Sequence, residues 1–124
     1  MRRCKPLLGT YVEISIADQS GDEVIQHAFD QIEKVQKLMS FHDSQSELSM
    51  MNARVHYKPI RVHPWTARIL RIAQDLYTHS GGLFNCGIGH RLVAAGLLPQ
   101  HITFTNHELG GIEDIQFLAP DLIK

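Results

Sequence analysis

The stretch Leu38–Asn52, Leu-Met-Ser-Phe-His-Asp-Ser-Gln-Ser-Glu-Leu-Ser-Met-Met-Asn, decides how this chain folds. A long amphipathic pattern runs into it and stops there without a glycine or a proline. The polar connection Phe41–Ser46 follows, and Ser44-Gln45-Ser46-Glu47 has the Ser-x-x-Glu form of a capping box. That form predicts a second, short helix from residue 45 or 46 to residue 51 or 52. Because proteins often present side chains to ligands on polar connections between helices, this turn is a candidate binding element.

Two long amphipathic helices are expected on either side of the turn. From Glu23 to Met39 the apolar residues recur every three or four positions, which predicts one helix. The second, Pro64–His79, has a proline in its first turn and ends before Gly81-Gly82. A short helix is expected over Arg91–Leu98, before a loop from Pro99 to Gly111. The predicted buried residues of the second long helix are Trp65, Ile69, Ile72, Ala73, Leu76 and Tyr77.

The predicted strands are few and short. Tyr11–Ala17 alternates polar and apolar residues, and Tyr57–Val62 and Ile115–Leu118 are further candidates, whereas Pro120–Lys124 shows no turn. These elements predict an α+β fold, with a small mixed or antiparallel sheet packed with two long amphipathic helices. Three strands cover little of two such helices. From the strand count alone, residues 1–124 are expected to be a domain that is cut short.

Composition indicates an ordinary globular protein. The 124 residues are 44% hydrophobic and 20% charged, and 12 Lys and Arg nearly balance 13 Asp and Glu. Without a basic stripe we expect no nucleic-acid partner, and without a long apolar run we expect no transmembrane segment. The basic residues Arg2, Arg3 and Lys5 precede no apolar signal core, so as written the chain is expected to stay in the cytoplasm.

Isolated polar residues give weak signals. The eight histidines, His56 and His107 among them, show no pair at i,i+4 and are expected to be surface or capping residues. His42-Asp43 is an adjacent His–carboxylate pair, which leaves a general acid/base role open. Cys4 and Cys86 are expected to be free thiols, with Cys86 buried.

Four glycines follow the second long helix. Gly81-Gly82 with Gly87 and Gly89 only superficially resembles a phosphate loop, and a helix terminator followed by a tight turn is the better interpretation. Gly87 and Gly89 indicate close backbone approach, either to another segment or to a ligand.

Three short motifs become specific through their order in the chain. Gly9-Thr10 opens a strand, Leu38-Met39-Ser40 leads to Ser46-Glu47-Leu48-Ser49 and Asn52, and Gly82-Leu83-Phe84-Asn85 follows a capped helix. In this order they resemble the N-terminal part of the ApbE family, the FAD:protein FMN transferases once named thiamine-biosynthesis lipoproteins. The family pattern is Met-Gly-Thr, then Leu-Met-Ser-x-Tyr with Ser-Glu-Leu-Ser-x-x-Asn, then Gly-Ala-Phe-Asp-Pro-Thr.

The resemblance implies that residues 1–124 are the N-terminal portion of a single domain. It also implies a magnesium-dependent enzyme that splits FAD and releases AMP. It would transfer FMN through a phosphoester bond to a threonine or serine of an acceptor flavoprotein. Family members often work at the outer face of the bacterial inner membrane. The flavin-contacting positions implied by the resemblance are Leu8, Gly9, Thr10, His42, Leu83, Phe84 and Asn85.

The chain departs from the family pattern in two ways. Phe84 is the only identity among the matched FAD-contacting side chains, and Asn85 stands where the family has a charged Asp. The later family motif Asp-Leu-Gly-Gly-Ile-Ala-Lys-Gly, which belongs to the half with the magnesium ligands, is not in this sequence. We therefore assign no catalytic or metal residue and expect the chain to be inactive alone.

One alternative is a non-catalytic flavin- or partner-binding module, whose exposed helix faces an oligomeric partner would cover. A homodimer stays open on this interpretation.

Overall fold

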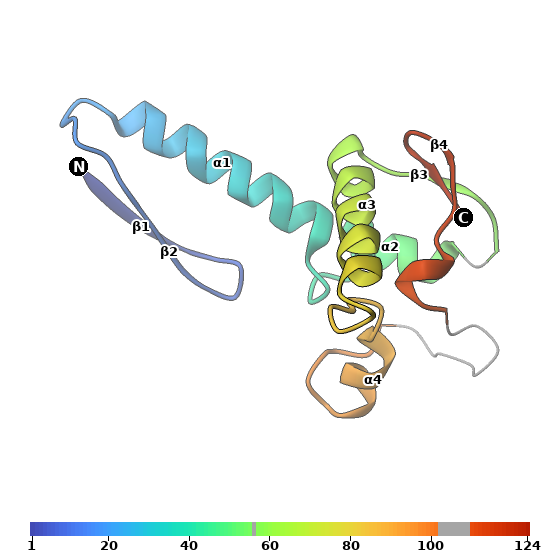
Figure 1. Cartoon of the computed structure of the whole chain (residues 1–124). Helices are drawn as coiled ribbons and strands as arrows, with labels where there is room; N and C mark the ends of the chain where they lie inside the picture. Colours follow the sequence, from blue (N-terminus) through green and yellow to red (C-terminus); the bar gives the residue numbers. More distant parts are fainter. Residues whose placement is uncertain (56, 102–109) are drawn as a thin grey trace.

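The computed structural model describes residues 1–55, 57–101 and 110–124 and has the predicted α+β fold (Figure 1). A hairpin of β1 (Arg2–Leu7) and β2 (Thr10–Ser15) lies along α1 (Asp22–Met39). At the other end of α1 lie the remaining elements: α2 (Glu47–Arg54), β3 (Ile60–Arg61), α3 (Pro64–His79), α4 (Gly89–Ala94), the 3₁₀ helix η1 (Ile112–Asp114), β4 (Phe117–Ala119) and β5 (Leu122–Ile123).

The β1–β2 hairpin packs on the first half of α1. Leu7 pairs with Thr10, so Leu8 and Gly9 form a two-residue turn in which both φ angles are positive, 57° and 73°. Two positive φ values are those of a type I′ turn, whose twist suits a hairpin. The buried side chains here are Leu7, Ile25 and Phe29, with Met1, Val12, Ile14, Ile16 and Ile32 packed around them.

The first strand is absent from the sequence-based prediction. β1 carries Arg2, Arg3 and Lys5, and most of its residues are exposed, so it shows no clear apolar alternation. Its strand conformation comes from backbone pairing with β2 along the whole of both strands. Gly9, which the sequence analysis placed at the opening of a single strand, therefore lies in a hairpin turn between two strands.

A second core lies between α2, α3 and the three-stranded sheet. β5 is the central strand of this sheet and pairs antiparallel with both β3 and β4. Ala119 pairs with Leu122, so Pro120 and Asp121 form the turn that the sequence did not indicate. The buried residues of this core are Met51, Val62, Ala67, Leu70, Ala73, Ile112 and Ile123.

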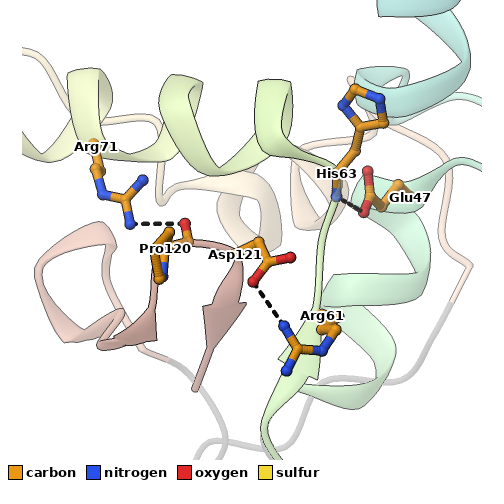
Figure 2. Close-up of polar contacts among 6 residues, drawn as sticks. All are labelled: Glu47, Arg61, His63, Arg71, Pro120 and Asp121. Carbon is orange, nitrogen blue, oxygen red and sulfur yellow. Dashed lines mark hydrogen bonds and ion pairs between the residues drawn. The ribbon is translucent and has the colours of Figure 1, made fainter.

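Two arginines hold the Pro120-Asp121 turn in place (Figure 2). The Arg61 guanidinium lies 2.8 Å from the Asp121 carboxylate, and Arg71 donates a hydrogen bond of 2.8 Å to the carbonyl of Pro120. Arg71 also lies over the Phe117 ring, 4.2 Å from its centroid. The β4–β5 turn is thus held by contacts from β3 and α3, which are far away in sequence. The local sequence around Pro120 could not indicate these contacts.

The two long helices have the predicted bounds, within one residue at the start of α1 and without difference for α3. The shorter elements differ more: Tyr57–Val62 is a strand only at Ile60–Arg61, and the expected helix Arg91–Leu98 is Gly89–Ala94. Most of the predicted loop before Gly111, together with His56 and His107, lies outside the described residues. In the described ranges no helix is long and apolar enough to cross a membrane.

The buried face of α3 differs from the prediction. Ile69, Ile72 and Leu76 are 36%, 49% and 46% exposed, and Thr66, Ala67 and Leu70 are buried in their place. Ala73 is buried as predicted, and Trp65 and Tyr77 are partly buried. The helix therefore has two apolar faces, and the face with small residues lies against the second core, where alanines allow close packing. Apolar periodicity predicts the helix but cannot determine which of the two faces is covered.

We expect Leu70→Ala to lower the free energy of unfolding by about 2–5 kcal/mol, because it leaves a cavity in the second core. Ile72→Ala on the exposed face is the matched control, with an expected change within about 0.5 kcal/mol. Urea denaturation of both variants measures the difference. Equal losses would contradict the assignment of the buried face.

Candidate functional site

Two buried serines fix the turn between α1 and α2. The Ser46 hydroxyl donates to the carbonyl of Ser40 at 2.6 Å and accepts from the backbone N–H of Ser49 at 3.1 Å. The Ser49 hydroxyl donates to the carbonyl of Asp43 at 2.7 Å. Each hydroxyl has one proton, and each uses it on a carbonyl of the turn. The two serines thereby satisfy two carbonyls of the turn and join its two ends.

The residue that caps α2 is Ser46, not Ser44. The predicted capping box is wrong because Glu47 is already the first helical residue and its carboxylate faces α3 instead. One oxygen of Glu47 accepts from the backbone N–H of His63 (Figure 2). The other accepts from the Thr66 hydroxyl at 2.8 Å. A carboxylate at the N-terminus of α3 satisfies one free backbone N–H group and interacts favourably with the positive end of the helix dipole.

His42 lies exposed in the middle of this turn. Its neighbour Asp43 accepts from the backbone N–H of Gln45 at 2.8 Å, which is an Asx turn. The Asp43 carboxylate thus stabilises the chain reversal, and within the described residues the His42 side chain makes no hydrogen bond. The structure gives no support to a His42-Asp43 acid/base pair.

Leu8, Gly9 and Thr10 form the tip of the β1–β2 hairpin. The backbone N–H of Leu8 donates to the side-chain oxygen of Gln36 at 2.6 Å, which places the tip beside the last turn of α1. Leu8 is 54% exposed, and no atom would lie within 4 Å of a Cβ added at Gly9. At the tip, the apolar side chain of Leu8 and the backbone of Gly9 are therefore accessible to solvent.

The loop after α3 begins with two left-handed glycines. Gly81 and Gly82 have φ angles of 63° and 85°, and the Gly82 N–H donates to the carbonyl of Tyr77 at 2.9 Å. Both angles suit glycine and end the helix. The interpretation as a helix terminator rather than a phosphate loop is therefore confirmed.

Leu83, Phe84 and Asn85 follow in a loop that two local hydrogen bonds hold. The Phe84 N–H donates to the Ser80 hydroxyl at 2.9 Å, and the Asn85 side-chain oxygen accepts from the N–H of Gly87 at 2.9 Å. Leu83 is 92% exposed and Phe84 is 45% exposed. The amide oxygen of Asn85 is thus used within the loop, and its NH₂ group remains to act as a donor.

Two contacts bring the three predicted segments to one region of the molecule. Gln36 binds the hairpin tip one helical turn before the loop that carries His42. The Phe41 ring packs so closely on Gly89, at the start of α4, that a Cβ there would lie 3.2 Å from it. The carbonyl of Phe41 also lies 2.7 Å from a ring nitrogen of His101. The hairpin tip and the start of α4, which follows the Leu83–Asn85 loop, thus both contact the region around the end of α1, although the seven predicted residues make no hydrogen bond across segments in the described structure.

Close backbone approach is confirmed at Gly87. A Cβ there would lie 2.8 Å from the backbone nitrogen of Ile112, so only glycine fits beside η1. This contact seats the loop after α3 on the second core. The approach is to another segment of the chain, which decides between the two alternatives that the sequence left.

A cavity of about 430 Å³ opens between α2, α4 and η1. This volume is that of a small-molecule pocket, and its polar groups include Asn52, His90 and Asp114. None of the seven predicted residues lines it, but two direct neighbours, Phe41 and Cys86, do. Three apolar lining residues recur at helical spacing along α2 and its C-cap, and this spacing could have indicated the cavity from sequence: Leu48, Met51 and Val55.

Cys86 is exposed, so the prediction of a buried thiol is wrong, and Cys4 is exposed and free as predicted. Partial desolvation of the thiol beside the cavity nevertheless raises the pKa of Cys86. The residue reaches solvent on one side and borders the cavity on the other. Within the described residues, no group of three His, Cys, Asp or Glu side chains is arranged to hold a metal ion.

The family model of the ApbE family matches residues 8–115. The chain belongs to the ApbE family. An ApbE protein from Thermotoga maritima is similar in structure, with a TM-score of 0.80, 16% identity, and coverage of 99% of this chain and 43% of that chain. No curated protein sequence matches this chain significantly.

Two ApbE flavin transferases are also similar in fold. The flavinyl transferase from Pseudomonas stutzeri has a TM-score of 0.77 and 15% identity, and the match covers 99% of this chain and 43% of the transferase chain. The flavin transferase from Vibrio cholerae has a TM-score of 0.77 and 22% identity, and the match covers 100% of this chain and 44% of the transferase chain. The chain thus spans less than half the length of the solved structures it matches, and at these identities the likeness shows the fold.

We expect Ser46→Ala to lower the free energy of unfolding by about 1–3 kcal/mol, because it removes the α2 cap and leaves the Ser40 carbonyl unpaired. Ser44 is the serine that the sequence suggested as the cap, but Ser46 takes that role in the structure. Ser44→Ala should therefore change the free energy of unfolding by less than about 0.5 kcal/mol. Thermal and urea denaturation of the two variants measure this. A larger loss for Ser44→Ala would contradict the cap assignment.

The raised pKa of Cys86 predicts slow alkylation near neutral pH. In a Cys4→Ser background, the iodoacetamide rate should reach half of its plateau above the pH of about 8.5 at which a free cysteine titrates. Burial favours the neutral thiol, so the reactive thiolate forms only at higher pH. Glutathione under the same conditions is the control, and a midpoint at or below its value would refute the prediction.

Proposed function

We propose that this chain is the N-terminal portion of an FAD:protein FMN transferase and that it provides one wall of the FAD site. The observation that carries the proposal is the family match over residues 8–115, together with a fold shared over 99–100% of the chain with solved flavin transferases. The whole enzyme would split FAD and transfer FMN to a threonine or serine of an acceptor flavoprotein in a magnesium-dependent reaction.

Exposed apolar side chains on adjoining loops support the flavin-binding role. The side chains of Leu8, Leu83 and Phe84 are 54%, 92% and 45% exposed. They lie on two of the three predicted segments, the hairpin tip and the loop after α3. Flat aromatic rings such as those of FAD bind by covering apolar and aromatic side chains. The His42 imidazole, exposed on the third segment, can stack on such a ring, and the NH₂ group of Asn85 can donate to a ring oxygen or nitrogen.

The described residues do not fit a magnesium site. Mg²⁺ takes carboxylate and carbonyl oxygens in octahedral geometry, and no group of acidic, His or Cys side chains in the described ranges gathers to supply them. We therefore derive no bond-breaking step from these residues. Their proposed task is to bind FAD and hold its rings.

The exposed face of α3 supports the proposal that residues 1–124 are part of a larger single domain. Ile69, Ile72 and Leu76 form an apolar stripe on a helix whose other face is already buried. A helix that is apolar on both faces is usually covered on both. The same face also favours the alternative, a non-catalytic flavin- or partner-binding module. The described residues give no support to a homodimer.

We expect the chain to bind FAD and to transfer no FMN. With FAD, Mg²⁺ and an acceptor flavoprotein, mass spectrometry should find no covalent flavin on the acceptor. Covalent flavin would contradict the expected inactivity while supporting the transferase assignment.

Phe84→Ala should weaken FAD binding about fivefold to tenfold, through the loss of an aromatic contact. The matched control is Leu118→Ala on β4, which removes an equally exposed apolar side chain away from the three segments and should leave FAD binding unchanged. Quenching of flavin fluorescence measures both. Equal effects of the two variants would count against a site at the loop after α3.

A further inference from the structure

We propose that Gln36 is a positioning residue that holds the hairpin tip, residues Leu8–Thr10, in register with the turn that carries His42. The inference rests on the proposed flavin-binding function and deepens it. Gln36 belongs to none of the segments that the family motifs indicate, and it acts through its neighbours rather than on the ligand.

The side chain of Gln36 is one half of the arrangement. Its amide oxygen accepts the backbone N–H of Leu8 at 2.6 Å, across 28 residues of sequence. Leu8 is a central residue of a two-residue hairpin turn, so its N–H is not part of the regular β1–β2 pairing. This hydrogen bond ties the end of the hairpin to α1.

The backbone of Gln36 is the other half. Its carbonyl accepts the N–H of Ser40 at 2.9 Å and so closes the C-terminus of α1. The carbonyl of Ser40 in turn accepts from the buried Ser46 hydroxyl at 2.6 Å. One residue therefore connects the hairpin tip, through its side chain, and the His42 turn, through its backbone.

The conformation of Leu8 shows why the tip needs a fixed partner. Its φ of 57° is in the left-handed region, which favours glycine or asparagine and costs a leucine steric strain. A strained residue persists where the surrounding structure determines it, and such residues gather at ligand contacts. Here the determining contacts are the hairpin and the Gln36 hydrogen bond, while the Leu8 side chain remains largely exposed.

A hairpin tip fixed in this way presents Leu8 at a constant position relative to His42. Without the Gln36 acceptor, the tip can move relative to α1, and ordering it again costs free energy when a ligand binds both segments. Affinity for a ligand that spans the two segments should therefore fall, while the hairpin body remains packed on α1 through Leu7, Ile25 and Phe29.

The test compares two substitutions of equal length at residue 36 in the full chain. Gln36→Met removes the acceptor and should weaken FAD binding about fivefold, the factor expected for one lost hydrogen bond. Gln36→Glu keeps a side-chain oxygen at the same reach and should bind FAD within about twofold of the unchanged chain. In hydrogen exchange, the Leu8 amide should lose protection in Gln36→Met alone.

Gln26 supplies the matched control on the same helix. Its side-chain oxygen accepts from Lys5 at 3.0 Å, so it also joins α1 to the hairpin, but at the body of the hairpin rather than its tip. Gln26→Met should leave FAD affinity and Leu8 exchange unchanged, with an effect on melting temperature similar to that of Gln36→Met.

The outcomes separate the inference from the function on which it rests. If the unchanged chain binds FAD and Gln36→Met binds equally well, the positioning role is overturned and the proposed function stands. If Gln36→Glu binds as weakly as Gln36→Met, the acceptor is not what matters and the inference also fails. If the unchanged chain does not bind FAD, the proposed function and the inference fall together.

Discussion

The carboxylate of Glu47 is the interaction on which the arrangement of the helices depends. It stands in the first turn of α2 and binds the N-terminus of α3, through the backbone N–H of His63 and the fully buried Thr66 hydroxyl. One side chain thus fixes where α3 begins and how it lies against α2. Because Thr66 and Leu70 lie on one face of α3, the same contact directs that face to the second core.

The position of the three candidate binding segments follows from this core. Ser46 and Ser49 close the turn next to Glu47, so the loop with His42 is held at the base of α2. The loop after α3 is seated where only Gly87 fits beside η1. α1 connects the second core to the hairpin, and a cation–π contact of 4.1 Å between Lys34 and the Trp65 ring joins it to the start of α3.

The sequence could predict which segments form the candidate site, but not how these segments contact one another in space. The motif order indicated the hairpin tip, the His42 turn and the loop at Phe84, and each is exposed on a loop. Gln36 gave no signal because a polar residue on the solvated side of a helix is ordinary, and its partner Leu8 is 28 residues away. For a similar reason the sequence did not indicate that the amide oxygen of Asn85 is used by a local turn, because spacing along the chain does not determine that contact.

The sequence by itself determined the two long helices, the existence of the short helix after the turn and the family. Apolar periodicity is a local property, and the order of motifs along the chain does not depend on which segments touch. Only the tertiary structure decided which face of α3 is buried, that β1 is a strand, and that Pro120-Asp121 is a turn between β4 and β5. Each of these depends on a partner far away in the chain or on backbone pairing. The stretch Leu38–Asn52 contains both cases: its serines cap and close a local turn, while its Glu47 acts on a helix that begins 17 positions later.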